Sequence, residues 1–423
     1  MRKTLLWLVI SAAFIGPGTV TATTNAGAQY GASLLWTIVF AVVACIVLQE
    51  GAARINIASN LSLGEAIIIQ FRATKKRFSL ALMLTIAVIL GCAAYEAGNI
   101  LGAIAGISIT TAINSKLATV VIVVIAAVLL YSNRFNLITN VLATIIGVMG
   151  LSLLVVVFTL DLNTVEVAKG LFIPRFPAGS ELLVLGLIGT TVVPYNLFLG
   201  SKLATSQELK SMRRGLGLSV ILGGLISISL ILIGSKVTGE YSFANVASTL
   251  ANATGSWATY FFAFGLFAAG LTSAITAPWA ASITFTSTIK TKSPNKAFHA
   301  VWIIVLLTGL IFGITDVKPI PIIILAQAVN GILLPFLAAT ILLVLNNNSV
   351  MKAYTNKWLG NIILMLILWI TGILGLINLT KAFYATFGIE SAISTTTLVI
   401  LAAISLLFTI LVAIKALNQS KTG

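Results

Sequence analysis

Charged residues are scarce in this chain of 423 residues. Only 8 % of the residues are charged, 59 % are hydrophobic, and the mean hydropathy is +1.09. A soluble domain of this length needs a far more polar surface, so the composition excludes one and indicates a polytopic membrane protein. The loops between apolar segments reach at most about 20 residues, too few for a soluble domain of their own.

Cysteine and histidine are nearly absent as well. Cys45 and Cys92 both lie in apolar segments, which argues against a disulfide framework or a metal–thiolate site. The single histidine, His299, lies beside the basic stretch 290–296 and is interpreted as a solvated loop residue. The sequence also shows no phosphate-binding glycine loop, Cys/His metal cluster or nucleophile triad. We therefore expect no enzyme activity and no cofactor, and a secondary transporter or channel-like carrier is favoured.

The chain does contain apolar segments of membrane length. We predict an all-α polytopic membrane protein with eleven or twelve transmembrane helices of about 20 residues each. The expected spans are 4–27, 32–56, 78–106, 117–132, 137–160, 181–200, 215–236, 256–287, 298–314, 320–346, 359–379 and 391–416.

The net charge of +15 follows the membrane topology. With the amino terminus in the cytoplasm, only six of the 25 Lys and Arg residues fall outside, and the other 19 fall inside. This bias fixes orientation and accounts for the charge without a nucleic-acid partner. We expect both termini to be cytoplasmic and the protein to reside in a bacterial plasma (inner) membrane.

Two spans are interrupted near their middles by proline. The first interruption is Gly16-Pro17-Gly18-Thr19, and the second covers residues 189–196 around Pro194. Proline removes a backbone donor, and freed backbone groups at membrane depth survive only against protein or around a polar cavity. The interruptions lie five spans apart, so their helices cross the membrane in opposite directions. This arrangement is typical of an inverted-repeat transporter with its site at the bilayer midplane.

Several polar side chains fall within the spans. Glu96 and Asn99, three residues apart, share a helical face among small residues, and Glu96 is either a functional carboxylate or a protonated group bonded between helices. Glu50 and Arg54 are interpreted as a structural ion pair. Hydroxyl-bearing residues of span eight are interpreted as contacts between helices. They are Thr272, Ser273 and Thr276.

These segments resemble a known family. The stretch 16–31, GPGTVTATTNAGAQYG, is similar to the first helix of the Nramp metal-ion transporters, which carry Asp-Pro-Gly-Asn at its start. Residues 193–199, VPYNLFL, resemble the Met-Pro-His-Asn-Leu stretch of their sixth helix, and Gln327 resembles the Gln of their tenth. The resemblance implies a LeuT-like fold. Its first inverted repeat would be 1–176, its second 177–356, and the additional C-terminal helices 357–423.

The departures from the family bear on the ion. The resemblance places the family's ion-binding Asp at Gly16, its Asn at Thr19, its Met at Val193 and its His at Tyr195, and an acidic pair implicated in proton movement at Glu96 and Asn99. The arginines that the family carries in helix nine are missing here. The chain therefore resembles an atypical branch that includes the Nramp-related magnesium transporters. Loss of the soft thioether and of one acid favours a hard, partly hydrated ion and weak or absent proton coupling.

The resulting hypothesis is an importer of divalent cations, Mg2+ favoured and Mn2+ tolerated, whose partners are the cation and the lipid bilayer, with no obligate protein partner. The candidate site residues are Ala13, Gly16, Thr19, Glu96, Asn99, Thr190, Val193, Tyr195, Asn196 and Gln327. Those expected to contact the metal, directly or through water, are Thr19, Glu96, Thr190 and Gln327. Two alternatives stay open: a transporter of a small organic or neutral solute, because neither interruption keeps a carboxylate, and a non-transporting sensor or scaffold.

Overall fold

The computed structural model describes residues 15–71, 77–132, 136–205, 208–315, 317–386 and 394–421. Side chains at 77–81, 136–143, 385–386 and 420–421 are outside this description. Within the described ranges all regular structure is helical. The helices are α2 (Pro17–Tyr30), η1 (Gly31–Leu34), α3 (Leu35–Ser59), α4 (Leu63–Gln70), α5 (Arg77–Thr110), α6 (Ser115–Ser132), α7 (Asn136–Val157), α8 (Thr164–Phe172), α9 (Glu181–Thr191), α10 (Pro194–Leu203), α11 (Leu209–Gly234), α12 (Phe243–Thr254), α13 (Trp257–Thr288), α14 (Pro294–Ile314), α15 (Pro319–Leu345), α16 (Asn348–Met351), η2 (Lys352–Tyr354), α17 (Trp358–Thr386) and α18 (Thr395–Lys421).

The membrane-length helices agree with the predicted spans. In the described part of the chain, ten segments are long and apolar enough to cross a membrane. One of them, Pro17–Ser59, joins the first two predicted spans, and another, Glu181–Leu203, contains both α9 and α10. The fifth predicted span is α7, whose described apolar part is the shorter Thr144–Val157. The prediction of an all-α polytopic membrane protein is therefore confirmed.

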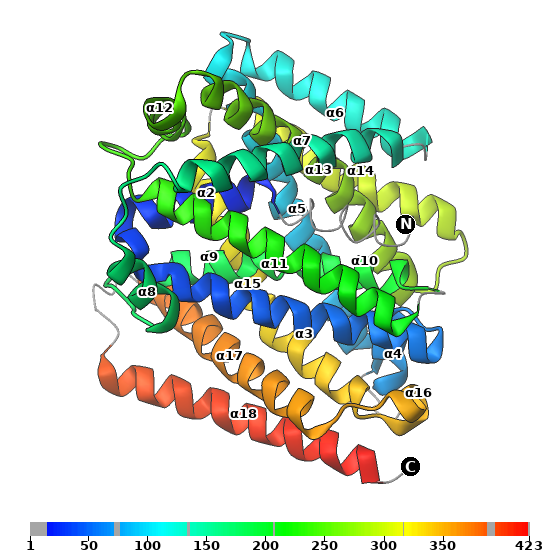
Figure 1. Cartoon of the computed structure of the whole chain (residues 1–423). Helices are drawn as coiled ribbons and strands as arrows, with labels where there is room; N and C mark the ends of the chain where they lie inside the picture. Colours follow the sequence, from blue (N-terminus) through cyan, green and yellow to red (C-terminus); the bar gives the residue numbers. More distant parts are fainter. Residues whose placement is uncertain are drawn as a thin grey trace.

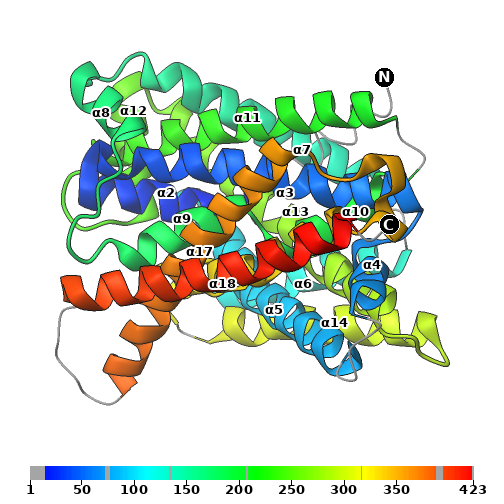
Figure 2. The same ribbon diagram turned by 90° about the horizontal axis from the view of Figure 1, so that it is seen from below.

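The helices run mostly along one direction, with short helices at the two ends of the bundle (Figures 1 and 2). The connecting helices α8 and α12 both lie at one end of the bundle, and α4 lies at the opposite end. Between these ends α9 and α10 lie one after the other near the middle of the molecule. The last two helices, α17 and α18, line one side (orange and red in Figure 1).

Proline determines where several of these helices begin. It has no N–H to donate, and the first helical position needs none, so it is tolerated there. Four helices have a proline in their first turn: α2 at Pro17, α10 at Pro194, α14 at Pro294 and α15 at Pro319. In α2 and α10 the helix therefore starts at membrane depth instead of at a membrane surface.

Glycine lets helix α2 lie directly against α11. A Cβ added at Gly27 would lie 2.0 Å from the backbone oxygen of Ile231, and one added at Gly234 would lie 2.2 Å from the backbone oxygen of Thr24. The two backbones are thus in contact along this seam, as expected for small residues between membrane helices. Beyond it, the half-buried Tyr241 hydroxyl lies 2.6 Å from Thr24 Oγ1. Burial raises the pKa of this phenol above its ordinary value, so it stays protonated and can donate.

Candidate ion-binding site

The second predicted interruption is present and short. Helix α9 ends at Thr191, Val192 (φ −100°, ψ 77°) and Val193 (φ −78°, ψ 119°) are not helical, and α10 begins at Pro194. Pro194 lies four residues after Thr190, so the Thr190 carbonyl loses the N–H that would have bonded it in a continuous helix. The chain is therefore unwound over two residues, fewer than the stretch 189–196 that the sequence indicated.

The first interruption is described on one side only. Gly16 is extended (φ −88°, ψ 175°), and α2 starts at Pro17 with no side-chain cap. Ala13, a predicted site residue, lies outside the described residues, as does the predicted helix before the interruption. The described part shows a buried helix start whose first N–H groups lie at the candidate site.

The two interruptions meet across the interior. Thr19 Oγ1 in α2 and Thr190 Oγ1 in α9 are 2.9 Å apart, and both side chains are buried. They border a cavity that is lined by Gly16, Gly18, Thr19, Tyr95, Asn99, Thr190, Val193, Tyr195 and Ser273. Six of the predicted site residues thus come together from the helices α2, α5, α9 and α10, from the N-cap of α2 and from the unwound Val193. They are Gly16, Thr19, Asn99, Thr190, Val193 and Tyr195.

The cavity is small. The volume open to the centre of a water-sized sphere is about 10 Å³, which is about the room that one water molecule requires. A hydrated cation needs more space than this, so its binding would require α2 and α9 to separate. Replacement of the family's Asp by Gly16 does not by itself create a wide pocket, because Ser273 Oγ lies only 3.2 Å from where a Cβ on Gly16 would be.

Tyr95 is a wall residue that the sequence prediction missed. Its hydroxyl donates to the backbone oxygen of Gly189 at 2.9 Å, so it bonds a carbonyl in the last turn of α9. Its ring meets that of Tyr195 edge to face, with centroids 5.7 Å apart. Tyr95 precedes Asn99 by four residues, so both project from one face of α5. This four-residue spacing from the predicted site residue Asn99 is the sequence feature from which Tyr95 could have been predicted. Ser273, interpreted above as a contact between helices, also belongs to the wall.

Glu96 lies behind this wall. It is fully buried, and its Oε2 accepts a hydrogen bond from Asn99 Nδ2 at 3.3 Å. A Cβ added at Gly309 would lie 2.9 Å from Glu96 Cγ, so the side chain packs against α14. Its Oε1 has no hydrogen-bond partner among the described residues. A charged carboxylate in this position is expensive without a proton or a cation, so Glu96 is a candidate for either.

Two further predicted residues lie close to the interruptions without lining the cavity. A Cβ added at Gly18 would lie 1.8 Å from Gln327 Nε2, so the amide of Gln327 rests against the start of α2. Asn196 is fully buried, and neither its Oδ1 nor its Nδ2 has a hydrogen-bond partner in the described part of the chain. The Oε1 of Gln327 likewise has no hydrogen-bond partner among the described residues. Buried amides are normally paired, so these atoms are available to water or a ligand when the site rearranges.

The ligand atoms of the wall are hard and uncharged. Hydroxyl, phenol, amide and backbone oxygens surround the cavity, and none of the described lining residues contains sulfur. The described residues contain no group of three or more His, Cys, Asp and Glu side chains that could hold a metal ion. Oxygen donors of this kind suit hard divalent cations, and the absence of carboxylates suits a cation that keeps part of its water.

In the described residues, a buried helix start at Pro17 and the interruption between α9 and α10 meet at a polar cavity, an arrangement typical of transporters of the LeuT-like class. Solved structures support the fold. A manganese transporter of Eremococcus coleocola, crystallised with an aromatic bis-isothiourea compound, gives a TM-score of 0.73 at 20 % identity and covers 99 % of this chain and 94 % of that one. MhsT in complex with L-phenylalanine gives 0.62 at 18 % identity and covers 90 % and 98 %. At these identities the likeness concerns the fold alone.

The family is more specific than the fold. A protein-family model described as natural resistance-associated macrophage protein-like, or Nramp, matches residues 7–381, and the chain belongs to this family. Among named relatives, the divalent metal cation transporter MntH of Verminephrobacter eiseniae is 26 % identical over 371 residues, which cover 83 % of this chain and 82 % of the relative. The resemblance seen in the interrupted helices and in Gln327 is therefore confirmed at the level of the family.

Proposed function

We propose that this protein imports divalent metal cations, with Mg2+ preferred and Mn2+ tolerated, and with weak or no coupling to protons. Membership of the Nramp family supports a divalent-metal transporter and not an enzyme, since the matching relatives are named as metal transporters. The single observation that carries the site assignment is the Thr19–Thr190 hydroxyl pair, which joins the two interruptions at a buried polar cavity.

The preference for Mg2+ is supported by the donor set. Val193 stands where the resemblance places a methionine, so the wall has no soft sulfur to favour a transition metal. Mg2+ binds hard oxygen and gives up its waters reluctantly. With no carboxylate on the wall, we propose that the ion keeps several waters, and that Thr19, Thr190, Gln327 and Glu96 contact it directly or through those waters after the cavity opens.

Weak proton coupling is supported by what surrounds Glu96. The helix packed against it, α14, contains no arginine, and Tyr195 replaces the family's histidine at the cavity. An inside-negative potential contributes about 2.3 kcal/mol per charge per 100 mV, or about 4.6 kcal/mol for a dication. Downhill import of Mg2+ therefore needs no proton gradient.

Uptake into proteoliposomes tests both the preference for Mg2+ and the dependence of transport on a proton gradient. Initial rates of Mg2+ and Mn2+ uptake, with K+ flux as the monovalent control, are compared at a fixed inside-negative potential with and without a pH gradient. We expect Mg2+ to enter faster than Mn2+ and the rate to be insensitive to the gradient. A faster Mn2+ rate would contradict the preference, and uptake that requires the pH gradient would contradict weak coupling.

A gain-of-function variant sharpens the test of selectivity. The double substitution Gly16→Asp with Val193→Met adds a carboxylate, which suits both ions, and a thioether, the softer ligand that favours Mn2+ over Mg2+. We expect the Mn2+/Mg2+ rate ratio to rise. Gly16→Asp with Val193→Leu, which keeps the carboxylate and adds bulk without sulfur, is the matched control and should leave the ratio unchanged. An equal rise in both variants would show that the sulfur does not set the ratio.

The family assignment does not favour the alternative of a small organic or neutral solute. Thermal-shift measurements with amino acids and with divalent ions would separate the two, because only the bound substrate class should stabilise the protein. We also propose that both termini are cytoplasmic in a bacterial plasma membrane, with repeats at 1–176 and 177–356 and additional helices at 357–423. The excess of Lys and Arg in the segments expected on the inner side supports this orientation.

A further inference from the structure

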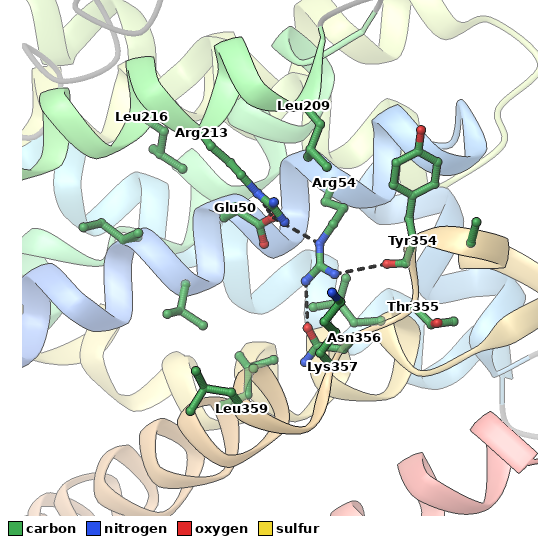
Figure 3. A pocket seen from close by; sticks show the side chains of 16 residues that line it. Glu50, Arg54, Leu209, Arg213, Leu216, Tyr354, Thr355, Asn356, Lys357 and Leu359 are labelled. Carbon is green, nitrogen blue, oxygen red and sulfur yellow. Dashed lines mark hydrogen bonds and ion pairs between the residues drawn. The ribbon is translucent and has the colours of Figure 1, made fainter.

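A second and much larger cavity lies where α3, α11 and α17 approach the segment 353–357 (Figure 3). Its volume is about 640 Å³. The proposed orientation places it at the cytoplasmic end of the bundle, because α3 ends and α11 begins there. None of its lining residues belongs to the ion site described above.

One side of this cavity is a network of charged and polar groups. Arg213 Nε and Nη2 donate to Glu50 Oε1 at 2.9 and 2.7 Å. Arg54 Nε lies 3.2 Å from the same oxygen. The Arg54 guanidinium also donates to the Tyr354 backbone oxygen at 3.0 Å and to Asn356 Oδ1 at 2.8 Å. Figure 3 shows both arginines reaching into the space between the helices.

The mouth of the cavity has an excess of positive charge. Lys357 lines it and is exposed, and its ammonium has no hydrogen bond or ion pair with the described residues. Lys210, Arg213 and Arg214 line an adjoining hollow together with Glu208. Five cations, the fifth being Arg54, therefore face only two acids, and one of these acids, Glu50, already contacts two arginines. The remaining charge is suited to an anion.

The other side of the cavity is apolar and continues into exposed apolar residues of α3 and α17. On α3 the exposed Val39 and Val43 lead along one helical face to the lining residues Ile46 and Val47. On α17 the lining Leu359 is 54 % exposed, and the exposed face continues away from the cavity. The next exposed residues of that face are Ile362 and Leu366. The cavity is thus a charged recess with an apolar wall formed by residues of α3 and α17.

We propose that this recess binds an anionic phospholipid of the cytoplasmic leaflet. Its phosphate would lie at Arg213 and Lys357, and an acyl chain would lie against Val47 and Leu359 and the exposed apolar residues that follow them on α3 and α17. Basic pockets between membrane helices on the cytoplasmic side are suited to lipid headgroups. A small soluble anion would use the cations but would leave the apolar wall uncovered. The inference rests on the proposed orientation and is independent of the transported ion.

Thermal unfolding of the detergent-purified full chain tests the proposal, with no transport measurement involved. The midpoint is titrated with phosphatidylglycerol, with phosphatidylcholine of the same acyl chains, and with inorganic phosphate. We expect only phosphatidylglycerol to raise it. Lys357→Gln should weaken the apparent affinity for phosphatidylglycerol about fivefold, the contribution of one basic residue at a membrane surface. Lys292→Gln, an exposed lysine between α13 and α14, is the matched control and should have no effect.

Two more variants separate the headgroup from the chain. Arg213→Gln should weaken the phosphatidylglycerol effect further, whereas Leu359→Trp should obstruct the apolar wall while all charges remain. Because Lys357 has no partner in the described structure, its replacement keeps the test valid even if Arg213→Gln unfolds. Equal stabilisation by both lipids, or an unchanged response in Lys357→Gln and Leu359→Trp, would overturn the proposal. Stabilisation by phosphate alone would identify a site for soluble anions and would also contradict it.

Discussion

Replacement of Gly189 by alanine should separate α9 from α15 and disable the ion site. A Cβ at this position would lie 2.2 Å from the backbone oxygen of Gln327 and 2.7 Å from the backbone nitrogen of Gly331. Both obstructing atoms belong to the backbone, so no side chain can rotate away, and α9 must move. The movement would carry Thr190 away from Thr19 and the Gly189 carbonyl away from the Tyr95 hydroxyl.

The same helix offers a matched control one turn earlier. A Cβ on Gly186 would lie 3.7 Å from Gln327 Cβ and 3.9 Å from the backbone oxygen of Ile324, which are ordinary contacts. Alanine is favoured over glycine inside a helix by about 1 kcal/mol, and this gain is common to both variants. Overpacking costs about 1–3 kcal/mol and applies to Gly189→Ala alone. The difference in stability between the two variants therefore measures the steric cost directly.

The assay combines thermal unfolding in detergent with Mg2+ uptake normalised to folded protein. Gly186→Ala should unfold at the same or a higher temperature than the parent and should transport normally. Gly189→Ala should unfold below Gly186→Ala and lose most of its uptake. If the two variants share one midpoint and one rate, the backbone contact between α9 and α15 is not what holds the interruption in place, and this reasoning is wrong.

Three further predictions concern pairs of side chains. Thr19→Val and Thr190→Val, combined in a double-mutant cycle of unfolding free energies, should show a coupling of about 0.6–1.7 kcal/mol, as for other hydrogen bonds between membrane helices; additivity would show that the hydroxyls do not interact. Glu96→Gln should unfold no earlier than the parent, because it removes a costly acid, but should slow Mg2+ uptake about ten- to hundredfold, as loss of an outer-shell partner does. An unchanged uptake rate would assign Glu96 to packing. Lys381→Met should cost less than about 1 kcal/mol, since its 2.6 Å ion pair with Glu181 is partly exposed, and the cost should vanish in high salt.

The interruptions of the helices were predictable because they follow from local chemistry. Proline lacks an N–H wherever it occurs, so Pro17 and Pro194 mark helix starts without reference to the rest of the chain. The structure places a helix start at each. The length of the second interruption could not be predicted from the local sequence. Helix α9 continues to Thr191 because the residues that follow Gly189 still form helical hydrogen bonds. Only Val192 and Val193 are non-helical.

The composition of the cavity wall depended on contacts that the sequence does not specify. Glu96 and Asn99 were correctly paired by their spacing, and a hydrogen bond joins them. Which of the two faces the cavity is decided by the rotation of α5 against its neighbours. In the structure Tyr95 and Asn99 face the cavity, and Glu96 turns toward α14. The hydroxyl of Ser273 was ambiguous for the same reason, because serine serves equally between helices and at a site.

The position of Glu96 connects ion selectivity with energy coupling. A carboxylate on the wall would bind a dehydrated dication strongly and would compensate the cost of removing its water. Such a site suits tight and selective binding. Here the only described acid near the site is Glu96, which does not line the cavity and is separated from it by Asn99, its hydrogen-bond partner. A dication in the opened cavity would then meet dipoles first and would keep much of its hydration. Such binding is weak, and weak binding suits an abundant ion that the membrane potential already drives inward. Under the proposed function, weak proton coupling and a preference for Mg2+ would share one cause, the absence of a carboxylate from the two interruptions.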